Sequence, residues 1–397
     1  AFALRSLGLG LILIGDISPL MIPQSFYSVA DNFILLAVPM FLMMSNILLK
    51  AGVGEDLFNF AQSWVGNFPG GLAIATIVSC SIFAAISGSS VATAATISTV
   101  AFPAMINRGY HRNFTLGILA AGGTLGILIP PSIPMILYAV MSGSSVVEVF
   151  VAGVIPGVVG GVLMMAVAYR FAVRHNYPVE QTFQLSRLWQ TFKDASWSLL
   201  LPVIILGGIF TGWVTATEGA GLAVVAATLI GGLIYRELDL KHLRSSMLDG
   251  GVQTAVVMLL VATSALLATY LTETQVPQKL AQSMIELTTN RYLILAMLNV
   301  FFLAIGLFLH SVAAIILVVP IVMPLVYAVG IDPVHFGLVV TLNLGIGQQT
   351  PPVASVLVTA CSVAKADIWE VSKVNVRFVA VLLAVLLLVT YAPAIPL

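Results

Sequence analysis

Two short stretches of the chain place a proline pair four residues after a glycine. The first reads GILIPPSIPM from Gly126, and the second reads GQQTPPVASV from Gly347. Proline lacks a backbone N–H and its ring clashes with the preceding helical turn, so a helix cannot run through either pair intact. The carbonyls of Ile129 and Thr350 precede the pairs and cannot serve an ordinary helical ladder; Thr350 adds a hydroxyl. Each stretch therefore predicts a broken helix.

Such a break can bind ions in two ways. Its freed carbonyls are oxygen ligands for a cation, and the exposed N-terminus of the following helix favours an anion. Gly126 and Gly347 would allow a close approach of backbone or unusual dihedral angles. Oxygen-only ligands suit a hard cation, and the sequence shows no His/Cys cluster for a transition metal. The breaks therefore predict a sodium site.

Two apolar stretches are interrupted near their middle by polar residues. SGSS, from Ser87 to Ser90, interrupts residues 70–106, and His310 with Ser311 interrupts residues 292–329. Each stretch is predicted to be a helical hairpin that enters the membrane and turns back. A non-helical tip is tolerated at that depth only inside protein or a wet cavity, so the tips are expected to line a site.

Hydroxyl and amide side chains gather at these tips and breaks. Ser89 or Ser90 would cap the returning helix of the first hairpin, and Ser311 that of the second. His310 is either a proton site or a simple polar tip residue. No Lys or Arg lies near a tip or break in the sequence, so an anionic substrate would depend on helix N-termini and neutral donors, which suit a polyhydroxylated ligand. The candidate substrate residues are Ser89, Ser90, Thr124, His310, Ser311, Asn343, Gln348 and Gln349.

The composition is that of a membrane protein. Of the 397 residues, 59% are hydrophobic and 8% are charged, whereas a soluble domain carries about 25% charged residues. The formal net charge is zero, so nothing indicates a nucleic-acid partner. Apolar runs long enough to cross a lipid bilayer recur along the chain, for example at 32–49, 151–169, 251–271 and 374–392. We therefore expect an all-α polytopic membrane protein.

The chain reads as two copies of one unit. A shift of 221 residues, from Gly126 to Gly347, also pairs Pro103 with Pro324, Gly109 with Gly330, and Ala139 with Ala360. The apolar segments follow the same shift: 1–19 pairs with 220–237, 31–50 with 252–271, 114–142 with 335–363, and 149–170 with 371–392. Segment 198–213 would pair with positions before Ala1, so we expect that one N-terminal helix is absent from this chain.

The distribution of Lys and Arg predicts the orientation of the chain in the membrane. If both hairpins return to the side they entered from and the polar linker 171–197 is cytoplasmic, all Lys and Arg except Lys279 and Arg291 fall on one face. Such a bias marks the cytoplasm. Each complete unit then makes an odd number of crossings, so the second copy is inverted and the C-terminus is periplasmic. Residues 54–66 would form an amphipathic helix on the cytoplasmic surface. Inverted repeats with discontinuous helices are typical of secondary transporters.

Three stretches, AISGSSVATAATI, GTLGILIPPSIPMILYA and GIDPVHFGLVVTLNLGIGQQTPPVAS, resemble the large membrane (M) subunit of tripartite ATP-independent periplasmic (TRAP) transporters. The resemblance covers essentially the whole chain. It implies a sodium-driven importer of organic acids in the bacterial inner membrane. It also implies a small four-helix membrane subunit and a soluble periplasmic substrate-binding protein as partners. The implied fold has a fixed scaffold and a transport domain with both hairpins, which moves as an elevator.

The resemblance also implies ligands for at least two sodium ions, mostly backbone carbonyls. The first site would use Ser87, Gly126, Ile129 and Pro131, and the second Gly306, Gly347, Thr350 and Val353. Many members carry an Asp where this chain has His310, and a Gly where it has Ala354. Both departures look like the sialic-acid branch, so N-acetylneuraminate is the expected substrate. A C4-dicarboxylate or another anion, coupled to sodium or protons, is the alternative, as is a carrier that works without a binding protein.

The expected organisation has six parts. They are scaffold helices with an interfacial helix (1–69), hairpin 1 with its broken helix (70–148), a scaffold helix with the linker and the first helix of repeat 2 (149–213), further scaffold helices (214–291), hairpin 2 with its broken helix (292–370), and a C-terminal helix (371–397). No catalytic residue is expected. An intramembrane serine hydrolase built on Ser89 or Ser90 with His310 would lack an orienting carboxylate, and an inverted repeat favours alternating access over a channel.

Overall fold

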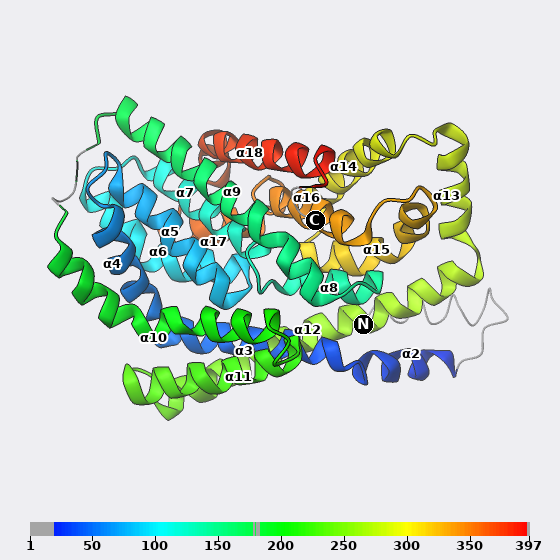
Figure 1. Cartoon of the computed structure of the whole chain (residues 1–397), viewed down its shortest axis with the longest axis horizontal. Coiled ribbons are helices and arrows are strands. Elements are labelled where there is room, and N and C mark those ends of the chain that lie inside the picture. The colour runs from blue at the N-terminus through cyan, green and yellow to red at the C-terminus, as the bar shows by residue number, and fades with distance from the viewer. Residues whose placement is uncertain (1–19, 178, 180–182, 395–397) are drawn as a thin grey trace.

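The computed structural model describes residues 20–177, 179 and 183–394, and in this part of the chain the regular elements are all helices (Figure 1). A layer of helices lines one side of the molecule, where α3 packs on both α11 and α12 and α10 packs on α11. The members of this layer are α2 (Met21–Ala30), the 3-10 turn η1 (Phe33–Leu36), α3 (Ala37–Lys50), α10 (Leu185–Phe210), α11 (Ala216–Leu229), the π-helical turn η3 (Ile230–Ile234) and α12 (Leu240–Glu273).

A thicker body holds the two hairpins and the two broken helices. Hairpin 1 is α5 (Gly71–Ser87) with α6 (Ser90–Asn107), and hairpin 2 is α14 (Arg291–Phe308) with α15 (Ser311–Ala328). The broken helices are α7 (Arg112–Thr124), which ends in η2 (Leu125–Ile127), with α8 (Ile133–Ser142), and α16 (Pro333–Gly347) with α17 (Ser355–Ala364). Both hairpins and both breaks lie where the sequence predicts them.

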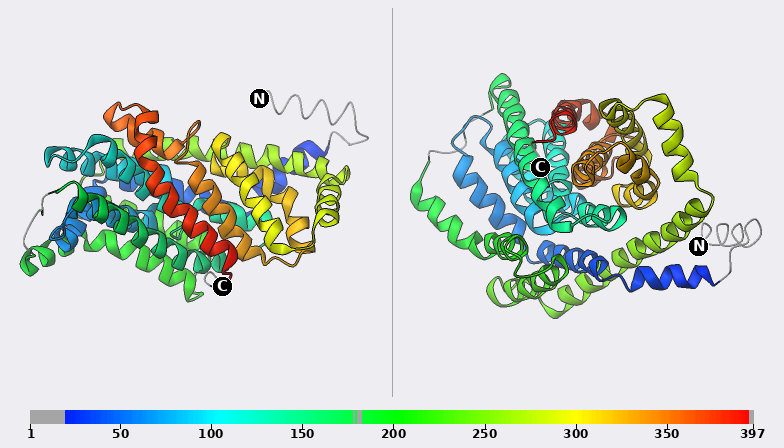
Figure 2. Two further views of the ribbon diagram at one scale, coloured as in Figure 1. Left: turned by 90° about the horizontal axis from the view of Figure 1, so that it is seen from above. Right: turned by 45° about the vertical axis from the view of Figure 1, so that its right-hand side comes forward.

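The remaining helices complete each half of the body. They are α4 (Val53–Val65) and α9 (Val146–Arg174) in the first half, and α13 (Val276–Leu287) and α18 (Ile368–Tyr391) in the second. Figure 2 shows hairpin 1 and hairpin 2 on opposite sides of α18, which packs on α7, α16 and α9. The predicted amphipathic segment 54–66 is helical, and α4 buries Leu57, Phe58 and Ala61 while it exposes Trp64.

Nine helices among the described residues are long and apolar enough to cross a membrane. They are Phe33–Lys50, Ser90–Asn107, Val146–Arg174, Leu185–Phe210, Ala216–Ile234, Leu240–Glu273, Arg291–Phe308, Ser311–Ala328 and Ile368–Tyr391. The shorter apolar helices are one arm of hairpin 1 and three of the four halves of the broken helices. The chain is therefore a multi-pass all-α membrane protein, as its composition predicts.

The repeat is visible in the helix boundaries. The shift of 221 residues places Ser90, the first residue of α6, on Ser311, the first residue of α15. It also places Arg112, the start of α7, on Pro333, the start of α16. The same shift brings α4 close to α13, a pair that the hydropathy of the sequence does not reveal because both helices are amphipathic rather than apolar.

Helix ends that the predicted orientation places on the same face of the membrane are joined by hydrogen bonds. On the face assigned to the cytoplasm, the His111 N–H at the start of α7 donates to the Tyr177 hydroxyl after α9 at 3.0 Å. On the opposite face, the Tyr327 hydroxyl near the end of α15 donates to the Ser142 carbonyl at the end of α8 at 2.9 Å. The pairing of ends agrees with inverted halves, and the assignment of one face to the cytoplasm stays a prediction from the cation bias.

Both ends of the predicted polar linker 171–197 are helical, because α9 continues to Arg174 and α10 begins at Leu185; polar residues end an apolar span without ending a helix. Helix α9 packs chiefly on α5, α16 and α18, which groups it with the hairpins rather than with α3 and α11. The segment 1–19 lies outside the described residues. The division into scaffold and transport parts stays a prediction, since it is defined by movement.

Candidate substrate and cation site at the helix breaks

The tip of hairpin 1 sits directly on the first helix break. The Ile133 N–H donates to the Gly88 carbonyl at 3.1 Å, whereas an α-helix would direct it to Ile129, four residues back. Gly88 has a φ of 63°, and a Cβ at this position would lie 2.7 Å from the Pro131 carbonyl oxygen. Only glycine accommodates both the dihedral angle and this approach. The Pro131 carbonyl therefore borders the tip.

Ser87 closes this tip from within the hairpin. Its side chain is fully buried, and its Oγ lies 3.0 Å from the hydroxyl of Thr93. The Thr93 hydroxyl in turn donates to the Ser89 carbonyl at 2.8 Å. A Cβ on Gly126 would lie 2.9 Å from the carbonyl carbon of Ser89, closer than real contacts allow. Glycine at 126 thus serves close approach, and Ser87, Gly126 and Pro131 of the first predicted sodium site lie at one tip.

Hairpin 2 meets the second break in a related way. The Val353 N–H donates to the Leu307 carbonyl at 3.2 Å, which again ties the segment after a proline pair to a hairpin. A Cβ on Gly347 would overlap the carbonyl group of Gly306 and lie 2.7 Å from its Cα. The Thr350 hydroxyl donates to the carbonyl one turn back at 2.9 Å, which leaves its lone pairs available to a cation. The second set of predicted ligands is likewise brought together.

The two tips are capped by equivalent residues. Ser89 Oγ accepts the Ala92 N–H at 3.4 Å, and His310 Nδ1 accepts the Val312 N–H at 3.4 Å. The prediction that Ser311 caps the second returning helix is wrong, because the last non-helical residue is His310 and Ser311 already lies in the helix. The acceptor atoms of Ser89 and His310 therefore serve their own helices, which speaks against a serine–histidine catalytic pair.

Three amide side chains bind the centre together. The Gln349 amide donates to the Thr124 hydroxyl at 2.8 Å and so joins the second break to the first. The Asn375 amide on α18 donates to Gln349 Oε1 at 2.9 Å. Next to this bridge, the Gln348 amide donates to Ser311 Oγ at 2.6 Å and fixes the returning helix of hairpin 2. All five side chains are buried. Of the residues predicted to contact substrate, Thr124 and Gln349 thus share one hydrogen-bonded group with Asn375, and Gln348 and Ser311 form a separate pair.

Asn343 takes part in a second buried chain. Its amide donates to Asn299 Oδ1 at 2.7 Å, and the Asn299 amide donates to the Thr390 hydroxyl at 3.1 Å. This chain connects α16, α14 and α18 one turn before Gly347. Asn343 therefore lies beside the second break, with its amide nitrogen committed to α14.

Sequence reasoning missed four of these polar residues. Thr93, Asn299, Asn375 and Thr390 are all buried and hydrogen-bonded at the breaks or directly behind them. A polar side chain inside an apolar membrane segment is by itself a sign of a functional site. Asn299 and Asn375 each lie in such an apolar segment, so the sequence alone could have indicated them as candidates for the site.

Several buried oxygens in the second half lack a donor within the described part of the chain. They are Gln348 Oε1, Asn343 Oδ1 and Asn375 Oδ1. A buried acceptor without a partner costs about 1–3 kcal/mol, so a ligand that supplies hydroxyl donors or a positive charge would be favoured here. No group of three or more His, Cys, Asp or Glu suited to a metal occurs in the ranges that the structure describes. Neutral oxygens of this kind fit a hard monovalent cation or a hydroxylated ligand.

Comparison with known proteins identifies the class. Residues 1–395 match the family described as tripartite ATP-independent periplasmic transporter, DctM component. The chain therefore belongs to this family and is the large permease of a TRAP transporter. The crystal structure of the YdaH transporter of Alcanivorax borkumensis has the same fold, with a TM-score of 0.65 over 96% of this chain and 90% of that chain. At 14% sequence identity, this likeness concerns the fold alone.

The sequence relatives carry different substrate names. The chain is 39% identical to the isethionate TRAP transporter permease protein DctMQ of Oleidesulfovibrio alaskensis over 94% of its own length, and spans 59% of that protein. It is 37% identical to the C4-dicarboxylate permease DctM of Pseudomonas aeruginosa, with 94% of this chain and 87% of that one covered. It is 36% identical to the sialic acid permease SiaM of Vibrio cholerae, with 82% and 77% covered. Identity does not separate the three substrates.

Proposed function

We propose that this permease imports an organic acid together with sodium ions. The observation that carries the proposal is the meeting of both hairpin tips with both helix breaks, joined by the Thr124–Gln349 hydrogen bond. The tips and breaks contain no charged residue, so a cation there would be held by carbonyls and hydroxyls alone. Sodium binding would in turn supply positive charge where an anionic substrate has no Lys or Arg to meet it.

Two sodium sites are part of this proposal, with the ligands that the family resemblance implies. The first would use Ser87 Oγ with carbonyls of Gly126, Ile129 and Pro131, and its support is the contact of tip 1 with the first break. The second would use carbonyls of Gly306, Gly347 and Val353 with Thr350, and its support is the contact of α14 with the second break. The sodium gradient across the membrane would drive uptake, and each bound ion would hold its hairpin tip on the adjacent helix break.

N-acetylneuraminate is the substrate that we propose. A sialic acid has one carboxylate and many hydroxyls, and hydroxyls can donate to the partnerless oxygens of Gln348, Asn343 and Asn375. A C4-dicarboxylate offers two negative charges and at most one or two hydroxyl donors, and succinate has none. Substrate contacts are therefore assigned to the amide cluster of the second break, together with Ser89, Ser90 and the exposed His310.

The partners and the setting are proposed from the family. A small four-helix membrane subunit and a periplasmic binding protein would complete the tripartite system, and an unmatched part of the DctMQ relative leaves room for a fused subunit. The complex would lie in the bacterial inner membrane with the linker after α9 in the cytoplasm and the C-terminus in the periplasm. The layer formed by α3 and α10–α12 would stay fixed while the hairpin body moves as an elevator.

Reconstitution tests this function directly. The complex is placed in liposomes, and uptake of labelled N-acetylneuraminate is measured under an inward sodium gradient, with and without the binding protein. We expect uptake to need both. Competition by unlabelled isethionate and succinate at equal concentration reports the alternative substrates. Uptake driven by a proton gradient alone would contradict the sodium assignment, and uptake without the binding protein would contradict the tripartite one.

Two substitutions locate the ions. Ser87→Ala and Thr350→Ala are each expected to raise the sodium concentration for half-maximal uptake about tenfold, a loss of about 1.4 kcal/mol. Ser81→Ala and Thr359→Ala are matched controls, because these hydroxyls only donate to carbonyls of their own helices at 2.8 Å. An equal sodium dependence of uptake in the variants and the controls would contradict sodium binding at the hairpin tips.

A further inference from the structure

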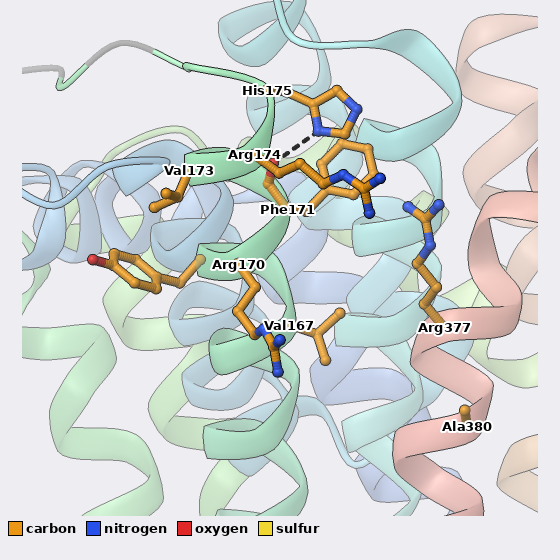
Figure 3. A pocket seen from close by; sticks show the side chains of 9 residues that line it. Val167, Arg170, Phe171, Val173, Arg174, His175, Arg377 and Ala380 are labelled. Atoms are coloured by element: carbon orange, nitrogen blue, oxygen red, sulfur yellow. Dashed lines mark hydrogen bonds between the residues drawn. The ribbon is translucent and has the colours of Figure 1, made fainter.

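A basic cavity of about 840 Å³ opens between the end of α9 and the first half of α18, on the face assigned to the cytoplasm (Figure 3). In Figure 3, Arg170 and Arg174 extend from α9 toward α18, and Arg377 reaches from α18 toward the end of α9. Six residues define its chemistry, namely Val167, Arg170, Phe171, Arg174, His175 and Arg377. Three guanidinium groups thus share a cavity with apolar walls.

One wall of the cavity is ordered by stacked rings. Phe171 stacks on Phe114 with ring centroids 3.8 Å apart and on His175 with centroids 3.9 Å apart. The guanidinium carbon of Arg377 lies 5.0 Å from the Phe171 ring centroid, a cation–π distance. Because Phe171 is held from two sides, Arg377 is held in place before any ligand arrives.

The three arginines have no acidic partner. Across the ranges that the structure describes, no carboxylate oxygen lies within 4.0 Å of Arg170, Arg174 or Arg377. Arg170 and Arg174 are four residues apart on one helical face, where like charges repel. All three are exposed. An anion in the cavity would relieve this repulsion and would accept charge-assisted hydrogen bonds.

The surroundings indicate a lipid rather than a soluble anion. Arg174 is the last residue of α9, a helix long and apolar enough to cross a membrane, so the cavity lies at the end of a span, where lipid headgroups are expected. Exposed apolar residues continue from the cavity toward the membrane centre, with Leu163 on α9 and Leu387 on α18. A headgroup in the cavity would leave its acyl chains along these side chains.

We propose that this cavity binds the phosphate of an anionic phospholipid of the inner leaflet, with Arg174 and Arg377 as its principal contacts and Arg170 as a third. Basic pockets between membrane helices on the cytoplasmic side bind such headgroups in general. The proposal does not depend on the proposed substrate, since none of the residues that line the cavity belongs to a hairpin tip or a helix break. A phosphate held between α9 and α18 ties together equivalent helices of the two repeats.

Lipid titration tests the proposal. The full chain, with any subunit that co-purifies, is delipidated in mild detergent and titrated with phosphatidylglycerol, cardiolipin, phosphatidylcholine or inorganic phosphate, and bound lipid is counted by native mass spectrometry. We expect a preference of at least tenfold for the anionic lipids over phosphatidylcholine. Arg174→Gln with Arg377→Gln is expected to abolish the preference, and Arg170→Gln alone to reduce it severalfold.

The matched control is Lys241→Gln with Arg244→Gln, which removes the same charge from exposed positions at the start of α12 and is expected to keep the preference. Strong competition by inorganic phosphate would support the arginine site and assign it a soluble anion. Equal lipid binding by the pocket variants and the control would overturn the proposal. Cross-linking of Arg377→Cys to a co-purifying subunit would overturn it as well, because protein would then cover the cavity.

Discussion

At the first helix break the hairpin tip is closed by small hydroxyl side chains, while at the second break amide side chains occupy the corresponding region. Ser87 and Thr93 bond to each other, and Thr93 donates to the Ser89 carbonyl, so the hydroxyls at this tip are paired within the hairpin. Further along α6, Thr96 Oγ1 and Ser98 Oγ are buried without a partner in the described chain. At the second break, Gln348 and Asn343 each bind a neighbour through nitrogen and leave a buried oxygen without a donor in the described chain.

The second break is also more exposed than the first. Ser132, directly after the first proline pair, is buried, whereas Val353, directly after the second, is 37% exposed, and His310 at the tip of hairpin 2 is exposed as well. The two halves thus share one backbone arrangement but differ in the exposure of their breaks. Under the proposed function, the first half would hold an ion alone, and the second would combine an ion site with partnerless groups that a hydroxylated ligand can satisfy.

The largest expected effect comes from the glycines under each tip. Gly347→Ala is expected to lower the unfolding free energy by about 3 kcal/mol and abolish uptake, because its Cβ would overlap backbone rather than a flexible side chain. Gly126→Ala, whose nearest contacts are 2.9 Å, is expected to do less harm. Thermal unfolding in detergent and liposome uptake measure both. Gly251→Ala in open space is the control, and a milder effect at 347 than at 126 would reverse the ranking of the two contacts.

The bridge between the halves is expected to rank second. Gln349→Leu leaves the buried Asn375 amide without its Gln349 acceptor and the Thr124 hydroxyl without a donor, at about 2 kcal/mol and at least a tenfold loss of uptake. Stability and uptake are measured on the same preparation. Gln282→Leu on the exposed face of α13 is the control. Normal uptake by Gln349→Leu would mean that the two breaks act independently.

A smaller effect is expected inside hairpin 1. Thr93→Val removes the hydroxyl that donates to the Ser89 carbonyl and should lower the unfolding free energy by about 1 kcal/mol. If the first half holds an ion alone, this variant also weakens sodium activation while competition by substrate analogues stays unchanged. Thr359→Val on α17 serves as the comparison. A changed substrate preference in Thr93→Val would contradict the proposal that the first break serves the ion and the second break serves the substrate.

The smallest effect concerns the amphipathic helices of the two halves. Burial and the nearby Asp194, Glu55 and Glu237 raise the pKa of Asp56 on α4 to about 6, whereas α13 has Pro277 at the equivalent position. A raised carboxyl pKa adds stability below pH 4 that is lost as the pH rises through 6. Asp56→Asn is expected to stabilise the protein at pH 8 by about 0.5 kcal/mol, since Asp56 is half exposed, and to change nothing at pH 4.

Unfolding midpoints at both pH values decide this case. Glu286→Gln on the exposed side of α13 is the control for the loss of one charge. An equal gain for Asp56→Asn at pH 4 and pH 8 would show that ionisation of Asp56 is not the cause.

The backbone plan could be predicted because its signals are local. Two proline pairs must break a helix, and the polar interruptions at Ser87–Ser90 and His310 mark tips within apolar runs. The capping residue of hairpin 2 could not be predicted as reliably, since it depends on which residue takes the extended conformation, and that residue is His310 rather than Ser311.

The polar clusters could not be predicted because they are long-range. Thr124, Gln349 and Asn375 come from three separate helices, and a single sequence does not show which faces of those helices pack together. The same holds for the arginine cavity, in which Arg170 and Arg174 meet Arg377 from the other repeat. In the sequence these cations only indicate which side of the membrane they occupy.

The Thr124–Gln349 bridge can form only once in the molecule. Under the repeat, Thr124 corresponds to Gly345 and Gln349 to Leu128, neither of which has a polar side chain. A chain assembled from two copies of the first half would set Leu128 against Thr124, and one assembled from two copies of the second would set Gln349 against Gly345. Duplication supplied two equivalent halves, but the present halves are no longer interchangeable, and a circularly rearranged or split version would function only if both different halves were present.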